Sequence, residues 1–258
     1  KKVGYLVERI GKKIIAGLDE LGRIASLLQQ IIVQGTKRPF NIKHFVQQMV
    51  KIGVDTLPIV SLMSIFVGMV LGYLAYLQFK IVGLEMYTGS LVAASLTMEL
   101  GPVLTAIIVS GRIGSSTAAE IGTMKVTEQI DALRTMATDP IKYLAVPRFY
   151  AALIMLPILT VFADIIGMFG GYMIGVWKFG IRHQINIQKS IDFLDPIDII
   201  NGLVKTIIFG GLMIAISCYK GFTASGGAEG VGQATTSAVV LSIMTVLVSD
   251  YLLTMILY

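Results

Sequence analysis

The sequence predicts an all-α integral membrane protein with five transmembrane helices. The 258-residue chain has a mean hydropathy of +0.77, and 55% of its residues are hydrophobic while only 14% are charged. This composition is far more apolar than that of a soluble domain. Five nearly uncharged runs approach the length of about 20 residues that an α-helix needs to cross a bilayer. Most Lys and Arg residues fall on one side of the resulting topology, which is typical of a membrane protein with a fixed orientation.

The first 50 residues are predicted to form an interfacial helix and a connection to the first span. Between residues 3 and 28, apolar residues recur every three or four positions, which places them on one face of a helix. Basic residues lie elsewhere, so we expect this helix in the inner headgroup layer; a soluble helix packed on another domain is the alternative. Residues 34–51, with Pro39, are predicted to be a polar connection. The apolar face consists of Val3, Leu6, Val7, Ile10, Ile14, Leu18, Leu21, Ala25 and Leu28.

The five predicted spans are residues 56–79, 88–110, 149–176, 199–219 and 234–258. The first span contains Gly68 and Gly72, whose spacing lets two transmembrane helices approach closely, and the third span repeats the pattern. The pattern favours packing within the chain but also allows dimerisation. Next to these glycines, one helix face near the outer leaflet either lines a cavity or faces lipid; it carries Leu71, Leu74 and Gln78.

A polar helix is predicted over residues 117–137, between the second and third spans. Thr117 and Glu120 have the spacing of a capping box, which indicates a new helix after the glycine turn at residues 111–114. Apolar residues form only a stripe on this helix, so we expect it to lie outside the lipid. The dipeptide Asp139-Pro140 would end it. The stripe consists of Ile121, Met124, Ile130 and Leu133.

The distribution of basic residues predicts the orientation. Sixteen Lys and Arg residues fall on segments on the side of the N-terminus, and four fall on the other side. This bias places the N-terminus in the cytoplasm and Tyr258 outside. The net charge of +5 is therefore an orientation signal. Nucleic-acid binding is not expected, because the basic residues are spread along loops without an aromatic–basic motif.

Three ionisable residues within the predicted spans are candidates for a functional site. A rise of about 1.5 Å per residue places Lys205 and Asp250 at a similar level in the outer half of the membrane, with Glu99 not far below, near the middle. Such charges are costly in lipid, so we expect them to pair or to line a wet cavity. A Lys205–Asp250 bridge that only locks two helices is the structural alternative. Asp164 is a weaker case, since the spans offer it no cation other than Lys205.

Several catalytic and cofactor motifs are missing. There is no G-x-x-x-x-G-K-[ST] phosphate loop, so the chain is not expected to bind ATP in the usual way. His44 and His183 stand alone, and no cluster with metal-ligand spacing occurs. A G-x-S-x-G nucleophile motif is also missing, and the glycine-rich run at 221–232 is expected to be a connector. We therefore predict no catalytic residue, no metal and no cofactor.

Four segments of the chain carry a family pattern. They are GMVLG at 68–72, ELGPVLTAIIVSGRIGSSTAAEIGTMKVTEQIDAL at 99–133, ATDPIKYLAVPRF at 137–149 and GVGQATTSAVV at 230–240. Together they resemble the MlaE-type permeases, the membrane subunits of bacterial ABC systems that maintain outer-membrane lipid asymmetry. Mycobacterial Mce importers and chloroplast lipid transporters are related to this family. The ELGP and EIGxMxxxEQ signatures are specific, and the resemblance spans nearly the whole chain.

The resemblance implies a homodimeric permease of the bacterial inner membrane that moves phospholipid. We expect the two copies to meet through their first and fifth spans. The family partners are a cytoplasmic ABC ATPase dimer that binds the ATP, a periplasmic MCE-domain hexamer and often a small STAS-domain protein. The polar helix would be the coupling helix, contacting the ATPase through Glu120, Met124, Glu128, Gln129 and Asp131. The lipid pathway would include Glu99, Lys205, Asp250, Leu71, Leu74 and Gln78.

The main functional hypothesis is thus a non-enzymatic phospholipid permease driven by a separate ATPase. One alternative is a membrane-embedded lipid-processing enzyme that uses Glu99 and Lys205 as acid and base. Another is a structural anchor for a periplasmic complex. Co-elution with an ATPase and lipid-stimulated ATP hydrolysis would favour the permease, whereas activity of the isolated chain would favour the enzyme.

Overall fold

The structure, a computed structural model, describes residues 2–37 and 41–258. Every regular element in these two ranges is a helix. The α-helices are α1 (Lys2–Gly35), α2 (Ile42–Met49), α3 (Leu57–Val82), α4 (Thr88–Ser95), α5 (Gly101–Val109), α6 (Ser115–Val126), α7 (Gln129–Thr135), α8 (Val146–Tyr172), α9 (His183–Phe193), α10 (Pro196–Phe222) and α11 (Gly227–Leu257). Short π-helical turns continue several of them: η1 (Val50–Val54), η3 (Leu96–Leu100), η4 (Ser110–Gly114), η5 (Ile141–Ala145) and η6 (Met173–Lys178). The turn η2 (Glu85–Tyr87) is a 3₁₀ helix.

Joined through these turns, five helices are long and apolar enough to cross a membrane, which confirms the predicted number of spans. They cover Ile42–Val82, Glu85–Val126, Ile141–Lys178, Pro196–Phe222 and Gly227–Leu257. At about 1.5 Å per residue, the first three exceed the hydrocarbon core of about 30 Å by a wide margin. Their ends therefore extend beyond the lipid, and the sequence-based boundaries mark only their apolar parts.

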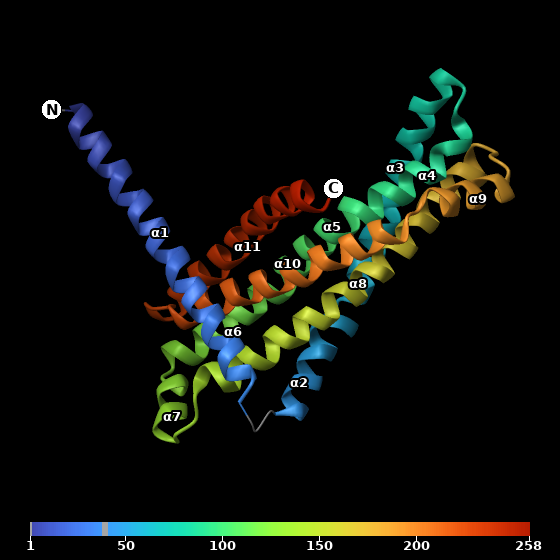
Figure 1. The fold of residues 1–258 in the computed structure, drawn as a ribbon. Helices are drawn as coiled ribbons and strands as arrows, with labels where there is room; N and C mark the ends of the chain where they lie inside the picture. The colour runs from blue at the N-terminus through green and yellow to red at the C-terminus, as the bar shows by residue number, and fades with distance from the viewer. Residues whose placement is uncertain (1, 38–40) are drawn as a thin grey trace.

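The spans form a bundle in which α8 and α10 are central (Figure 1). Helix α3 packs on α8, and α11 packs on α10 and α6. The core lies where α5, α8 and α10 meet. Helix α7 and the C-terminal part of α1 lie at one end of the bundle, and α9 lies at the other (Figure 1). Fully buried core side chains include Ala106, Val109, Leu156, Phe209 and Met213.

Glycines bring α3 and α8 into backbone contact. A Cβ atom added at Gly68 would overlap the carbonyl oxygen of Gly167, and one added at Gly72 would lie 3.0 Å from the Cα atom of Gly171. Because the overlapped atoms at both positions belong to the backbone of α8, no side-chain rotation can remove the overlap. The small-residue pattern of the first span therefore serves packing within the chain, which leaves other surfaces to make any contact between copies.

The predicted helix start at Thr117 is wrong. The chain runs as one helix from Glu85 to Val126, and the glycine segment forms the π-helical turn η4 instead of a break. A capping box needs backbone N–H groups that lack helical partners. Within a continuous helix these groups are already bonded, so the Glu120 carboxylate is available to pair with Lys51 and Arg148.

The predicted polar helix over residues 117–137 is also divided in two. Helix α6 ends at Val126, and α7 begins at Gln129. Glu128 separates them with a φ of 61°, which lies in the left-handed region that few non-glycine residues adopt. The chain therefore changes direction at Glu128, and α7 is a short helix of seven residues.

The N-terminal region differs from the predicted polar connection. Helix α1 reaches Gly35, and α2 already begins at Ile42, where the Asn41 side chain accepts a hydrogen bond from the His44 N–H at 3.1 Å. Pro39 lies outside the described residues. So do the side chains of residues 1–10, 13 and 14, which carry the predicted apolar positions Val3, Leu6, Val7, Ile10 and Ile14. Farther along α1, Ile24, Leu27 and Ile31 are buried.

Candidate functional site

The centre of the candidate site is Lys205 of α10, whose side chain is completely buried. Its ammonium group is surrounded by oxygen atoms from η3 and α11. The distances from Nζ are 2.8 Å to Glu99 Oε1, 2.8 Å to Thr254 Oγ1, 3.1 Å to the Met98 carbonyl oxygen and 3.3 Å to Asp250 Oδ1. An ammonium group has three protons, so this shell satisfies it without water. The site therefore joins the second, fourth and fifth spans through one buried cation.

Local sequence explains why Met98 offers its carbonyl. Pro102 has no N–H group, so the Met98 carbonyl lacks the backbone donor that would stand four residues later in an α-helix. Lys205 donates to it instead. Gly202 lies one turn before Lys205, and a Cβ atom there would overlap the Thr97 carbonyl oxygen. The glycine thus lets α10 approach η3 closely enough for the lysine to reach.

Thr254 connects the two carboxylates. It lies one helical turn after Asp250 on α11, and its hydroxyl oxygen accepts a hydrogen bond from Lys205. The same oxygen lies 2.9 Å from both Glu99 Oε1 and the Asp250 carbonyl oxygen, and its single proton can be donated to either. Asp250 Oδ1 forms an ion pair with Lys205 but has no hydrogen-bond partner among the described residues. The carboxylate of Asp250 is therefore the least satisfied member of the cluster.

The cluster carries one positive and two negative formal charges. Lys205 is inaccessible, the Asp250 side chain is 18% exposed and the Glu99 side chain is 37% exposed. The accessible group is therefore a carboxylate and not the cation. In this conformation, an anion reaches Lys205 only by displacing one of the two acids, whereas a cationic group can approach Glu99 directly.

The three ionisable residues pair, as the sequence led us to expect. Although Glu99 was placed slightly deeper than Lys205 and Asp250, its carboxylate lies closer to the ammonium than that of Asp250 does. Long Glu and Lys side chains together span more than one helical turn, so a Cα-based depth does not separate them. Thr254 and the Met98 carbonyl were missed, although the four-residue spacing from Asp250 and the proline at 102 were visible signals.

The three remaining pathway candidates lie together, away from this cluster. Leu71, Leu74 and Gln78 of α3 line a small, half-open cavity of about 190 Å³ between α3 and α4. The rest of its lining is Ala75, Leu91, Val92 and Ser95, and no residue of the Lys205 cluster contributes. Leu74 and Gln78 are also exposed, so this helix face both lines the cavity and belongs to the outer surface of the bundle. Their role in a lipid pathway stays a prediction.

The predicted ATPase-contacting residues divide into two groups. Glu120, Met124 and Gln129 line an open groove of about 450 Å³ together with Arg148. Glu120 bridges Lys51 and Arg148, the latter at 2.9 Å, so it also ties together the ends of the first three spans. Asp131 lies outside the groove and pairs with Lys125 and Arg134, and Glu128 occupies the turn between α6 and α7.

Five apolar helices, three of which meet at a buried ammonium group paired with two carboxylates, define a multi-pass membrane protein with a polar intramembrane site. Residues 45–256 match the family model described as Permease MlaE, and the chain belongs to this family of membrane permeases.

Relatives support this assignment over nearly the full length. A probable ABC transporter permease protein of Rickettsia prowazekii is 44% identical over 254 residues, which covers 98% of this chain and 96% of the relative. The intermembrane phospholipid transport system permease protein MlaE of Haemophilus influenzae is 38% identical over 259 residues, covering 98% and 97%. The chloroplastic protein TRIGALACTOSYLDIACYLGLYCEROL 1 of Arabidopsis thaliana is 38% identical over 224 residues, covering 87% of this chain and 64% of the relative.

Proposed function

We propose that this permease moves phospholipid between the inner membrane and a periplasmic MCE-domain carrier, driven by a separate ABC ATPase. The observation that carries the proposal is the buried Lys205 held between Glu99, Asp250 and Thr254. Burying two acids and a base in a bilayer is costly, and such groups are rare in membrane helices unless they serve a pathway. The name of the Haemophilus influenzae relative supports phospholipid as the cargo.

The cluster suits a zwitterionic or anionic headgroup in different ways. The exposed Glu99 carboxylate attracts a headgroup amine, and Lys205 becomes available to the phosphate once an acid is displaced. Asp250 and Thr254 hold the ammonium in place while no lipid is bound. Leu71, Leu74 and Gln78 would contact the acyl chains in the separate cavity between α3 and α4.

The proposed assembly is a homodimer with an ATPase dimer on the cytoplasmic side and an MCE hexamer outside, with a STAS-domain protein as a further partner. The charge distribution supports a cytoplasmic N-terminus and an external C-terminus. Helix α11 supports its proposed place at the dimer seam, because it leaves large apolar side chains exposed, among them Val248, Tyr251 and Met255. Helix α3 would contribute through the face opposite its glycines, which includes Leu62, Phe66 and Val70.

Reversing the charge of Glu128 tests the ATPase contact. Glu128→Lys is expected to weaken co-purification of the ATPase and to lower lipid-stimulated ATP hydrolysis, since this residue lies in the turn between α6 and α7. Lys is no better suited than Glu to a positive φ, so the substitution tests mainly the charge. The measurement is the ATPase-to-permease ratio after mild detergent extraction, together with the hydrolysis rate.

Asp192→Lys is the matched control, because Asp192 is an exposed acid on α9 at the opposite end of the bundle (Figure 1). It should leave both readings unchanged. Wild-type ATPase recovery and hydrolysis in Glu128→Lys would show that this turn does not contact the ATPase. Lipid turnover by the isolated chain would instead contradict the permease proposal as a whole.

A further inference from the structure

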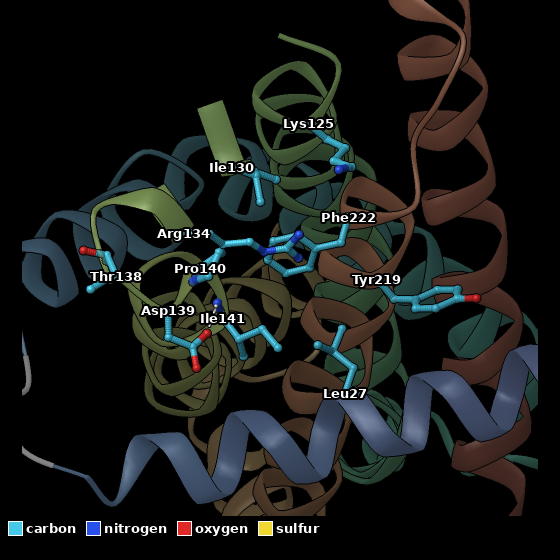
Figure 2. A pocket seen from close by; sticks show the side chains of 11 residues that line it. Leu27, Lys125, Ile130, Arg134, Thr138, Asp139, Pro140, Ile141, Tyr219 and Phe222 are labelled. Carbon is cyan, nitrogen blue, oxygen red and sulfur yellow. Dashed lines mark hydrogen bonds between the residues drawn. The ribbon is translucent and has the colours of Figure 1, made fainter. Parts of the chain in front are cut away.

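A cavity of about 510 Å³ lies at the α7 end of the bundle, remote from the Lys205 cluster (Figure 2). This half-open cavity is lined by α1, α7, the cytoplasmic-side ends of α6 and α10, and the segment leading into η5. Its volume is in the range of small-molecule sites. Along α10, Tyr219 at this cavity is about 21 Å from Lys205, given the rise of an α-helix. The cavity is therefore a separate site.

Its lining is amphipathic. Most of the wall is apolar and consists of side chains such as Leu27, Ile130, Ile141 and Phe222. Two cations, Lys125 and Arg134, also line the cavity, and Arg134 extends toward Phe222 in Figure 2. They share one carboxylate, Asp131, at 3.3 Å from Lys125 Nζ and 3.1 Å from Arg134 Nη1. Each cation therefore has further N–H groups to offer a ligand.

A second cavity of about 360 Å³ shares the wall formed by residues 137–139 and adds Lys142 to the lining. The shared wall contributes one acid, Asp139. Its two oxygens accept hydrogen bonds from the Ile141 N–H at 2.9 Å and from Gln34 Nε2 at 2.8 Å. The lining of the first cavity itself carries two cations, Lys125 and Arg134, and one acid, Asp139. The Gln34 contact also fixes the end of α1 to the segment that follows α7.

The position of the cavity selects the kind of ligand. It lies where α10 leaves the bilayer, beside Lys220 and under the amphipathic helix α1. The charge distribution assigns this end of the bundle to the cytoplasm. Basic pockets between membrane helices at the cytoplasmic surface favour anionic lipid headgroups. An apolar wall next to two cations matches a lipid better than a soluble anion, because only a lipid fills both parts.

We propose that this cavity binds an anionic phospholipid of the cytoplasmic leaflet as a resident lipid. Its phosphate contacts Lys125 and Arg134, and its glycerol and upper acyl chain cover Leu27, Ile141 and Phe222. The bound lipid joins α1, α7 and α10, and so steadies the segment proposed to meet the ATPase. It is not the transported lipid, whose proposed path lies at the other end of α10.

The test uses the full-length permease in nanodiscs of phosphatidylcholine with a minor share of phosphatidylglycerol. Native mass spectrometry after release measures the retained lipid. Wild type is expected to retain phosphatidylglycerol in preference to phosphatidylcholine. Lys125→Gln with Arg134→Gln should lower this retention by about fivefold for each charge removed. Lys37→Gln with Lys43→Gln is the control, since both lysines are exposed and line neither cavity.

Thr138→Trp separates binding from folding. Thr138 lines both cavities, so tryptophan fills space there while the cations stay in place. Loss of retained phosphatidylglycerol in this variant supports the site even if the double variant folds poorly. The proposal is overturned if Thr138→Trp retains the lipid as wild type does, if the control pair loses as much as the test pair, or if excess inorganic phosphate displaces the lipid.

Discussion

Replacing Lys205 with methionine is expected to cost about 3–5 kcal/mol of stability and to stop lipid transport. The substitution leaves Glu99 and Asp250 facing each other around an apolar side chain, and a buried charge without its partner is strongly destabilising. The measurement is the melting temperature of the purified permease in detergent, with lipid transfer in reconstituted vesicles. Lys178→Met is the control, since that lysine lies against the Tyr73 ring at 4.5 Å, outside the cluster.

A triple variant without charges tests whether the cluster takes part in transport or only holds the helices together. Because Lys205 pairs with both acids, Glu99→Gln and Asp250→Asn must accompany Lys205→Met; neutralising Asp250 alone would leave Glu99 unpaired. An apolar or neutral set can replace a buried ion pair at little cost in stability. We expect the triple variant to recover folding but not transport. Lipid transfer at the wild-type rate would show that the cluster only holds the helices together and has no role in transport.

Gly68→Ala is expected to have the second-largest effect. Alanine normally stabilises a helix by about 1 kcal/mol relative to glycine. At position 68, however, the new Cβ atom would overlap the Gly167 carbonyl oxygen, so α3 and α8 must separate along their shared face. Overpacking of this kind typically costs about 1–3 kcal/mol, and a backbone partner cannot move aside. The difference between this cost and the helical gain is a net loss of up to about 2 kcal/mol, measured as a lower melting temperature.

Gly232→Ala is the matched control for that experiment. Gly232 also lies within a helix, α11, but a Cβ atom added there meets no other atom within 4 Å. The control should be neutral or slightly stabilising. Equal melting temperatures for the two variants would mean that α3 and α8 do not meet through their glycines.

The membrane spans could be predicted because they depend on a property summed over many residues. A run such as residues 149–176 is so rich in apolar residues that its single acid, Asp164, does not change the result. The helix boundary at Thr117 depended on a single local motif. Thr117 and Glu120 have the right spacing for a cap, but capping also requires a helix end, which tertiary packing decides.

The candidate site could be predicted in part for a similar reason. A charge in an apolar run is conspicuous, so Glu99, Lys205 and Asp250 stand out in the sequence. Which atoms surround Lys205 depends on how α10 meets η3, and that contact is made by Gly202 and by a backbone carbonyl. Carbonyl oxygens carry no signal of residue type. Only Pro102 indicates from the sequence that one carbonyl oxygen, that of Met98, lacks a donor within its own helix.

The unbroken helix from Glu85 to Val126 connects the two ends of the molecule mechanically. Glu99 and Glu120 lie on this single rod, about 32 Å apart along its axis. A rotation of this helix near Glu120 would be carried toward Glu99 by its continuous backbone. The π-helical turn η4 lies between the two residues and η3 contains Glu99, so the torsional stiffness of these two turns would set how much of the rotation reaches Lys205.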